Sequence, residues 1–299
     1  MIRFPYRVSV CAVWAACLFS SACGRSHPRL TVGSKDSTEQ VLLGEILAQH
    51  LSKRLPDNQI ERRFGLGNVT LVHTSLLTGE ISVYPEYSGT ALFNVLNIEP
   101  DRGDDPLLDQ VREGYRTKFR CEWLGPLGYS SSRVFLIPRR IAEKRKIQNL
   151  TQASGNHEGW AIGGSREFRD RPDGMVLLTR KYEFQLSAPV QIVSEEQLYS
   201  ALSKDQLTFG VTRSTDPHLG SGDLVQLPDD QSVYPSYQAG YVVKLETLEA
   251  NPGLANAIKE LYGKITLERM RAMVRRVDFE KVPAEKAATD FLKEVGLSQ

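Results

Sequence analysis

The stretch "RLTVGSKDSTEQVLLGEILAQHLSKRL", from Arg29 to Leu55, indicates the fold of this 299-residue chain. Its first part, "RLTVGSK", is β-branched and apolar up to a Gly-Ser pair, which predicts a strand that ends in a loop. The part after it predicts an amphipathic helix, because leucines recur every four residues at Leu43, Leu47 and Leu51. Ser37 and, three residues later, Gln40 predict a capping box at the start of this helix. A strand followed directly by a helix is the repeating unit of α/β proteins.

The alternation of strand and helix continues through the first third of the chain. After a loop at 66–68, we expect a helix over 69–79, a strand over 80–85 and a helix over 106–119. This order predicts a mostly parallel sheet that is covered on both faces. Further along, we expect strands over 131–138, 159–164, 188–193 and 206–212, a capped helix over 194–203, and largely helical structure from about Leu245 onward. The pattern predicts two α/β lobes connected by strands that cross between them.

The N-terminal segment is typical of an export signal. Arg3 and Arg7 flank a start that leads into the apolar run "VSVCAVWAACLF", which is too short to span a bilayer. Cys23 follows the small residues "SSA" and resembles the cysteine of a bacterial lipobox, although Ser20 stands where such motifs usually have leucine. We therefore predict a lipoprotein-type signal peptide over 1–22 and lipidation of Cys23, with a periplasmic or extracytoplasmic, membrane-anchored protein as the result. The alternative is plain cleavage near Ala22, with Cys23 free or disulfide-bonded.

The charge balance argues against a nucleic-acid partner. The whole chain carries 37 basic and 36 acidic residues, and loss of 1–22 removes Arg3 and Arg7, so 35 basic residues remain against 36 acidic ones. Such neutrality does not suit a polyanion. The run 269–276, "RMRAMVRR", alternates with Met and Val at helical spacing and is expected to be one solvated helix face.

Motifs for catalysis and for metal binding are missing from the sequence. The histidines never form an HExxH pattern, no CxxC pair suits zinc, and no GxSxG motif offers a nucleophile. His157 beside Glu158 is interpreted as a pair on a surface loop. We therefore expect no enzyme, no metal and no cofactor.

Polar loops follow the expected strands of the first third. The stretches "GSKDSTEQ", "GLGN" and "EYSGT" each contain Gly, Ser or Thr where a strand would end. In α/β sheets, ligands bind beyond the carboxyl ends of the strands, where helix N-termini present free N–H groups. These loops together predict a binding cleft, although each alone is explained by turn geometry.

Five segments together resemble the ABC-transporter substrate-binding proteins for glycine betaine, choline and related osmoprotectants. They are "VGSKDSTEQVLLGEIL", "GNVTLVHTSLLTGEISVYPEYSGTAL", "GGSREFRDRPDG", "TRSTDP" and "PSYQAGYVV", and they occur in the family's order from about Leu30 onward. The resemblance implies a type II periplasmic-binding-protein fold, in which two lobes joined by two crossing strands close on the ligand. It implies one lobe of 30–126 plus 236–299 and another of 127–235, with crossings near "GYSSSRV" and "VYPSYQ".

The resemblance also implies the residues of the site. The family holds a quaternary ammonium in a box of tyrosines, because ring faces attract a cation that cannot donate hydrogen bonds. It holds the ligand carboxylate with basic and hydroxyl groups. Carried over by motif, the ligand-binding residues here are Lys35, Tyr87, Thr90, Arg171 and Tyr237. Tyr84, which alternates with Tyr87, is expected to pack in the core.

Two departures from the family pattern place arginines in the site. The family's "GF-x-N-T-Y" strand reads "GYSSSR" here, and its "V-Y-S-T-D" reads "VTRSTD", so Arg133 and Arg213 replace cage tyrosines. Our hypothesis is that arginines have replaced half of the family's tyrosine box and that the pocket prefers a ligand with net negative charge. Alternatively, the arginines turn to solvent or pair with Glu86, Asp216 or another acid, and a betaine-like ligand binds through Tyr87, Tyr237 and either Tyr129 or Tyr234. Lys35, Tyr87 and Thr90 are expected on one lobe, and the three arginines and Tyr237 mainly on the other.

The expected function is delivery of a small polar compound to an ABC importer without any chemistry. The ligand is a quaternary amine or an acidic or zwitterionic metabolite, and the protein partners are a permease and its ATPase, contacted by a monomer. A sensor or regulatory subunit on the same fold is the alternative. A periplasmic enzyme would need a nucleophile beside a group of strongly shifted pKa in the cleft, and the sequence shows no such pair.

Overall fold

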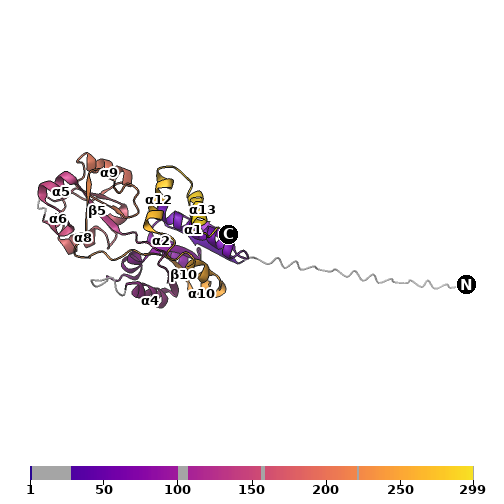
Figure 1. Ribbon diagram of the computed structural model, residues 1–299. Coiled ribbons are helices and arrows are strands. Elements are labelled where there is room, and N and C mark those ends of the chain that lie inside the picture. Colours follow the sequence, from indigo (N-terminus) through magenta and orange to yellow (C-terminus); the bar gives the residue numbers. More distant parts are fainter. Residues whose placement is uncertain (2–27, 100–106, 156–158, 221, 299) are drawn as a thin grey trace.

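A computed structural model describes Met1 and residues 28–99, 107–155, 159–220 and 222–298 (Figure 1). The predicted signal peptide, Cys23 and the pair of His157 and Glu158 lie outside the described residues. Among the helices of the described part, none has the length and apolar character needed to cross a membrane.

The first of two sheets has five strands in the order β2-β1-β3-β10-β4. Its strands are β1 (Arg29–Gly33), β2 (Gln59–Arg63), β3 (Val83–Tyr87), β4 (Cys121–Leu124) and β10 (Ala239–Lys244). β1 pairs in parallel with β2 and β3, as the alternating pattern predicts. β10 instead runs antiparallel between β3 and β4, because it belongs to a segment that returns from the second sheet. The expected parallel arrangement is thus confirmed for the first three strands only.

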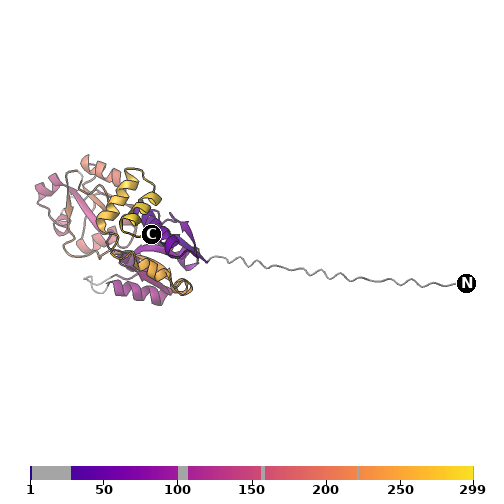
Figure 2. The ribbon, with the colours of Figure 1, turned by 45° about the vertical axis from the view of Figure 1, so that its right-hand side comes forward.

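Helices cover both faces of this sheet, as predicted. One face carries α1 (Thr38–Arg54), α10 (Leu245–Ala250), α11 (Leu254–Lys259), α12 (Leu267–Asp278) and α13 (Ala284–Glu294), and its core holds the leucines of α1. The other face carries α2 (Val69–Leu77), α3 (Ser88–Thr90), the π-helix η1 (Ala91–Leu96) and α4 (Leu107–Phe119). Figures 1 and 2 show α1 and the C-terminal helices α12 and α13 side by side, although they come from opposite ends of the chain.

The alternation of side chains along β3 decides which of its tyrosines reaches the site. Val83 and Tyr87 face the core under α1, whereas Tyr84 is fully buried in the core on the opposite face. Tyr84 therefore packs, as expected, and Tyr87 does not share its surroundings.

The second sheet has the order β7-β6-β8-β5-β9 and comes from the middle of the chain. Its strands are β5 (Arg133–Pro138), β6 (Ile162–Gly164), β7 (Gln191–Ile192), β8 (Phe209–Arg213) and β9 (Leu224–Leu227). Its helices are α5 (Arg139–Arg145), α6 (Leu150–Ser154), α7 (Arg166–Asp170), α8 (Met175–Tyr182) and α9 (Glu195–Ser203). It has cores of its own on its two faces, so the structure consists of two α/β bodies (Figure 1). This confirms the predicted α/β class.

The chain crosses between the two bodies twice, and the two crossing segments contact each other. Ser130 and Gln238 form an antiparallel bridge, and the backbone N–H of Tyr237 donates to Oγ of Ser130 at 2.9 Å. The loops at the ends of β3, β5 and β8 are thereby held at the junction of the two bodies.

One predicted capping box forms and the other does not. Ser194 and Gln197 cap α9 reciprocally, as expected. Ser37 is the N-cap residue of α1, but its side chain makes no capping hydrogen bond, so the capping box at Ser37 and Gln40 is wrong. Gln40 is only 1% exposed and lies beside the hydroxyl of Tyr87 instead of reaching back to Ser37.

The basic run 269–276 lies on the amphipathic helix α12. Its Met270, Met273 and Val274 are buried. Arg269 and Arg276 form ion pairs with Glu294 and Asp290 of α13 at the surface. The prediction of a solvated helix face is confirmed for these two arginines.

Gly240 in β10 tests the packing of the first sheet, because a Cβ at this position would lie 2.4 Å from Cζ2 of Trp123. We expect Gly240→Ala to lower the free energy of unfolding by about 1–3 kcal/mol, since either the ring or the strand must shift. Urea denaturation measures this effect. Gly155→Ala is the matched control: the carbonyl oxygen of Gln152 would be 3.5 Å from the new Cβ, and we expect a change within about 0.5 kcal/mol. Equal losses in the two variants would contradict the packing argument.

Candidate functional site

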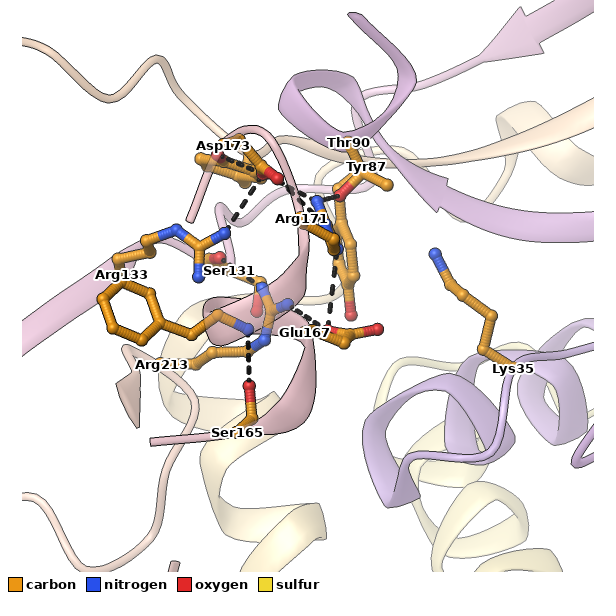
Figure 3. A network of polar contacts seen from close by, with 12 residues as sticks. Lys35, Tyr87, Thr90, Ser131, Arg133, Ser165, Glu167, Arg171, Asp173 and Arg213 are labelled. Atoms are coloured by element: carbon orange, nitrogen blue, oxygen red, sulfur yellow. Dashed lines mark hydrogen bonds and ion pairs between the residues drawn. The ribbon is translucent and has the colours of Figure 1, made fainter. Parts of the chain in front are cut away.

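Six of the seven predicted ligand-binding residues lie together at the junction of the two bodies (Figure 3), and Tyr237 joins them through its hydrogen bond to Asp173. They come from the ends of strands and from the loops beside them. Lys35 follows β1, Tyr87 ends β3, Thr90 lies in α3, Arg133 begins β5, Arg171 follows α7, Arg213 ends β8, and Tyr237 precedes β10. Tyr237 was expected mainly with the arginines on the second lobe, but it packs in the core of the first sheet. Their role in binding is not tested by this convergence and stays a prediction.

The carboxylate of Asp173 is the centre of the network and is fully buried. Arg171 donates to it twice, from Nε to Oδ1 at 2.9 Å and from Nη2 to Oδ2 at 2.7 Å. The hydroxyl of Tyr237 donates to Oδ2 at 2.7 Å, and the amide of Asn94 donates to Oδ1 at 3.1 Å. Nη2 of Arg133 is 3.1 Å from Oδ2. Burial would raise the pKa of Asp173, but Arg133 and Arg171 outweigh it and hold this pKa well below its usual value.

Arg133 and Arg213 are direct cross-strand neighbours on β5 and β8. Like charges at such positions repel one another. The two side chains accordingly pair with different acids: Arg213 donates from Nη2 to Oε2 of Glu167 at 2.8 Å, while Arg133 pairs with Asp173. Arg213 also donates to the carbonyl oxygen of Ser131 at 3.3 Å.

Arg133 lies among three aromatic rings, which we call the aromatic box: Phe168, Tyr234 and Tyr237. The guanidinium carbon is 5.5 Å from the ring centre of Phe168, 5.7 Å from that of Tyr234 and 5.8 Å from that of Tyr237. The Arg133 side chain is 3% exposed, yet its Nε and Nη2 have no hydrogen-bond partner. Charge and ring faces hold this guanidinium more than hydrogen bonds do.

Tyr87 lies between two further cations. Nζ of Lys35 is 5.2 Å from its ring centre, and the guanidinium carbon of Arg213 is 5.7 Å from it. Lys35 also pairs with the buried Glu86 at 2.5 Å. The pKa of Tyr87 is raised well above its usual value, first by burial and then by the carboxylate of Glu39.

Glu39, in the first turn of α1, is a buried acid held by hydroxyl groups. Tyr129 donates to its Oε1 at 2.6 Å, and Thr215 and Ser131 donate to its Oε2 at 2.7 and 3.1 Å. Thr215 belongs to the second body, so this carboxylate also joins the two bodies.

Direct contacts between the two bodies surround the site. Nη2 of Arg171 donates to the Thr90 hydroxyl at 2.8 Å. Nη2 of Arg271, in α12, donates to the carbonyl oxygen of Ser214 at 2.6 Å. A cavity of about 60 Å³ borders Arg133 and Arg213 on the side of the second sheet, which is room for about two water molecules. All residues that line this cavity belong to the second body.

Arg133 and Arg213 pair with acids, as the alternative interpretation expected, although these acids are not the named Glu86 or Asp216. Their partners are Glu167 and Asp173, which were not singled out from the sequence although both lie in the segment "SREFRDRPDG" with Arg171. The sequence did offer a signal for these acids, because Glu167 precedes Arg171 and Asp173 follows it within one short segment. Phe168, an aromatic residue of the same segment, was also not singled out from the sequence. Asp216 instead accepts hydrogen bonds from Thr212 and Tyr199.

Comparisons with known proteins agree with this architecture. The family model described as the substrate binding domain of ABC-type glycine betaine transport systems matches residues 28–294. The chain is 29% identical over 270 residues to the ergothioneine transport permease/ergothioneine binding protein EgtU of Helicobacter pylori, an alignment that covers 90% of this chain and 48% of that protein. This chain thus spans about half the length of that relative.

A second relative is similar over nearly its whole length. The chain is 28% identical to a glycine-betaine-binding protein of Pseudomonas aeruginosa, with 96% of this chain and 93% of that protein covered. The crystal structure of a glycine betaine/carnitine/choline ABC transporter superposes with a TM-score of 0.73 at 22% identity, covering 90% of this chain and all of that one. The fold is that of the type II periplasmic binding proteins. Because the family model spans almost all of the described residues, this chain belongs to the family of substrate-binding domains of ABC-type glycine betaine transport systems.

Proposed function

We propose that this chain is the extracytoplasmic, lipid-anchored solute-binding component of an ABC importer and that it binds a small zwitterionic or anionic solute between its lobes. It acts as a monomer, passes the solute to a permease driven by an ATPase, and carries out no chemistry. Family membership favours this role over that of a sensor on the same fold. The lobes are 30–126 plus 236–299 and 127–235, and ligand contacts to both stabilise the closed form.

One observation carries the proposal: basic and aromatic side chains from both bodies converge at their junction. Lys35 and Tyr87 come from the first body and Arg213 comes from the second, and all three lie within one cluster around the Tyr87 ring. A solute that touches this cluster contacts both bodies at once, which is the requirement for a ligand that drives closure.

The charges around the site favour a solute with a carboxylate and little net charge. Lys35 is balanced by Glu86, whereas three arginines, Arg133, Arg171 and Arg213, share the two carboxylates of Glu167 and Asp173. This leaves one positive charge in excess in the arginine cluster. Glu39, bound by three hydroxyls, supplies one negative charge on the other body. Four basic and four acidic groups thus balance overall.

A zwitterion matches this separation of charge. Its carboxylate would lie against Arg213 and its cation toward Glu39, with Tyr87 between them, since both groups act on the Tyr87 hydroxyl. Glycine betaine and ergothioneine, for which two relatives are named, each combine a trimethylammonium group with a carboxylate. A dicarboxylate is the anionic alternative.

Calorimetric titration of the purified mature protein tests the ligand class. We expect a zwitterion such as glycine betaine, or a dicarboxylate such as succinate, to bind about 10- to 100-fold more tightly than choline, which lacks a carboxylate, because a charge-assisted hydrogen bond contributes about 1.5–3 kcal/mol. Choline binding as tight as that of the carboxylates would contradict the proposal, and so would failure of every carboxylate-bearing solute to bind.

Arg213→Gln tests the carboxylate contact. We expect the affinity for the best carboxylate-bearing solute to fall by about 10- to 100-fold, because Gln retains a polar group without the charge. Arg139→Gln is the matched control: Arg139 pairs with the exposed Asp223 at the surface of the second body and should not change affinity. Thermal unfolding of both variants shows that they are folded. Equal affinity in the two variants would remove Arg213 from the binding site.

The lowered pKa of Glu167 predicts how the stability of the arginine cluster depends on pH. Burial raises its pKa, but Arg213 and Arg171 outweigh burial and lower this pKa from 4.5 to about 2. Because the pKa is lower in the folded protein, the stabilisation is complete above about pH 4.5 and is lost as the pH falls toward about 2. The side chain is 37% exposed, so solvent screening limits the contribution to about 1 kcal/mol.

We therefore expect wild type to exceed Glu167→Gln in unfolding free energy by about 1 kcal/mol at pH 7, with a smaller difference at pH 3. Urea denaturation at both values measures this. A difference that is the same at both values would show that the arginine pairs do not set the protonation of Glu167.

A further inference from the structure

We propose that Arg133 determines specificity by acting as a built-in cation: its guanidinium fills the aromatic box of Phe168, Tyr234 and Tyr237 and thereby keeps quaternary ammonium groups out of that box. The inference rests on the proposed binding site between the lobes and specifies what one part of that site rejects. In this structure Arg133 takes the place that a soluble cation would need.

The aromatic box is built from both bodies. Phe168 packs in the core of the second sheet, Tyr234 packs against that core, and Tyr237 packs in the core of the first sheet. The three ring centres lie within 5.5 to 5.8 Å of one guanidinium carbon. Three ring faces at this range around one cation exceed what a single surface contact provides.

Asp173 gives the box a negative charge. Its Oδ2 is 3.1 Å from Nη2 of Arg133 and accepts a hydrogen bond from the hydroxyl of Tyr237. Aromatic faces together with a carboxylate stabilise cations, including cations that have no N–H or O–H to donate. The box therefore has the chemistry of a quaternary ammonium site, with a protein side chain inside it.

The hydrogen bonding of Arg133 is unlike that of an arginine positioned to grip a ligand. Arg171 makes two hydrogen bonds to Asp173 and one to Thr90, whereas Nη2 of Arg133 approaches Asp173 at 3.1 Å without hydrogen-bond geometry and the buried Nε of Arg133 has no hydrogen-bond partner. A guanidinium in this state interacts mainly through its charge and its flat faces, as a donor-free cation would. Arg171 and Arg213 bind polar groups, and Arg133 fills space.

The walls of the box do not depend on Arg133 for their positions. The Tyr237 hydroxyl is held by Asp173, and the Tyr234 hydroxyl donates to the carbonyl oxygen of Gly174 at 3.2 Å. Asp173 keeps both hydrogen bonds from Arg171 when Arg133 is removed. Truncation of Arg133 should therefore leave an open aromatic box in which the acid is still partly neutralised.

Tetramethylammonium chloride is the probe, because it has the cation of interest and no carboxylate. We expect wild type to bind it no better than about the level of matched sodium chloride, and Arg133→Ala to bind it at least about tenfold more tightly, as a desolvated cation–π site allows. Calorimetry at constant ionic strength measures both. Arg133→Met is the matched control, since its side chain is neutral but still fills the box, and we expect it to bind no better than wild type.

A second variant and a second probe guard against misfolding. Arg133→Thr introduces a β-branched residue, which suits the start of strand β5, and should show the same gain as Arg133→Ala. Ethylguanidinium, which reproduces the lost group, should raise the melting temperature of both truncated variants and leave that of wild type unchanged. Circular dichroism confirms that each variant is folded.

The inference is overturned if folded Arg133→Ala and Arg133→Thr bind neither tetramethylammonium nor ethylguanidinium, or if wild type binds tetramethylammonium as tightly as they do. A gain in Arg133→Met equal to that in Arg133→Ala would also overturn it, because loss of repulsion alone would then be the cause. None of these binding measurements uses the natural ligand, so their outcome does not depend on its identity. Failure of the proposed function shows itself separately, as wild type that binds no carboxylate-bearing solute.

Discussion

The buried carboxylate of Asp173 is the interaction on which the site depends. A carboxylate without any exposed surface must be paired and hydrogen-bonded, or its burial would be very costly. Arg171, Tyr237 and Asn94 meet that requirement, and Arg133 is attracted to the same charge. Tyr237 and Asn94 belong to the first body, so satisfying this one acid positions side chains from both bodies. Arg171 is then oriented so that it also reaches Thr90.

A second constraint is the register that sets Arg133 opposite Arg213. Like charges at directly opposed strand positions repel, and the two guanidinium groups point to different acids, Asp173 and Glu167. This divergence gives the site two parts of different chemistry. In the part around Tyr87, the proposal places a solute carboxylate beside Arg213. In the aromatic box, the bound cation is the guanidinium of Arg133 itself.

Sequence reasoning found the basic residues and the tyrosines of the site but neither Phe168 nor the acids Glu167 and Asp173. Lys35, Arg171 and Arg213 stand in recognisable motifs at the ends of strands, and the structure brings them together. Glu167 and Asp173 lie close to Arg171 in the chain, but acidic residues are common on protein surfaces, and the burial of Asp173 follows only from the packing of the two bodies. Gln40 shows the reverse error: its spacing from Ser37 suits a capping box, yet its side chain is buried beside Tyr87 and makes no capping hydrogen bond.

The sequence by itself determined the α/β class, the order of most helices and strands, and the family, because periodicity and short motifs are local properties of the chain. Comparison of short motifs with the family pattern also indicated that Arg133 and Arg213 belong to the site. Only the tertiary structure decided that β10 is inserted antiparallel, that Tyr237 belongs to the first body, and that Arg133 lies inside an aromatic box. These features join residues that are distant in the chain. Where a charged side chain points is decided by which acids and rings the completed fold brings within reach, and no local pattern contains that information.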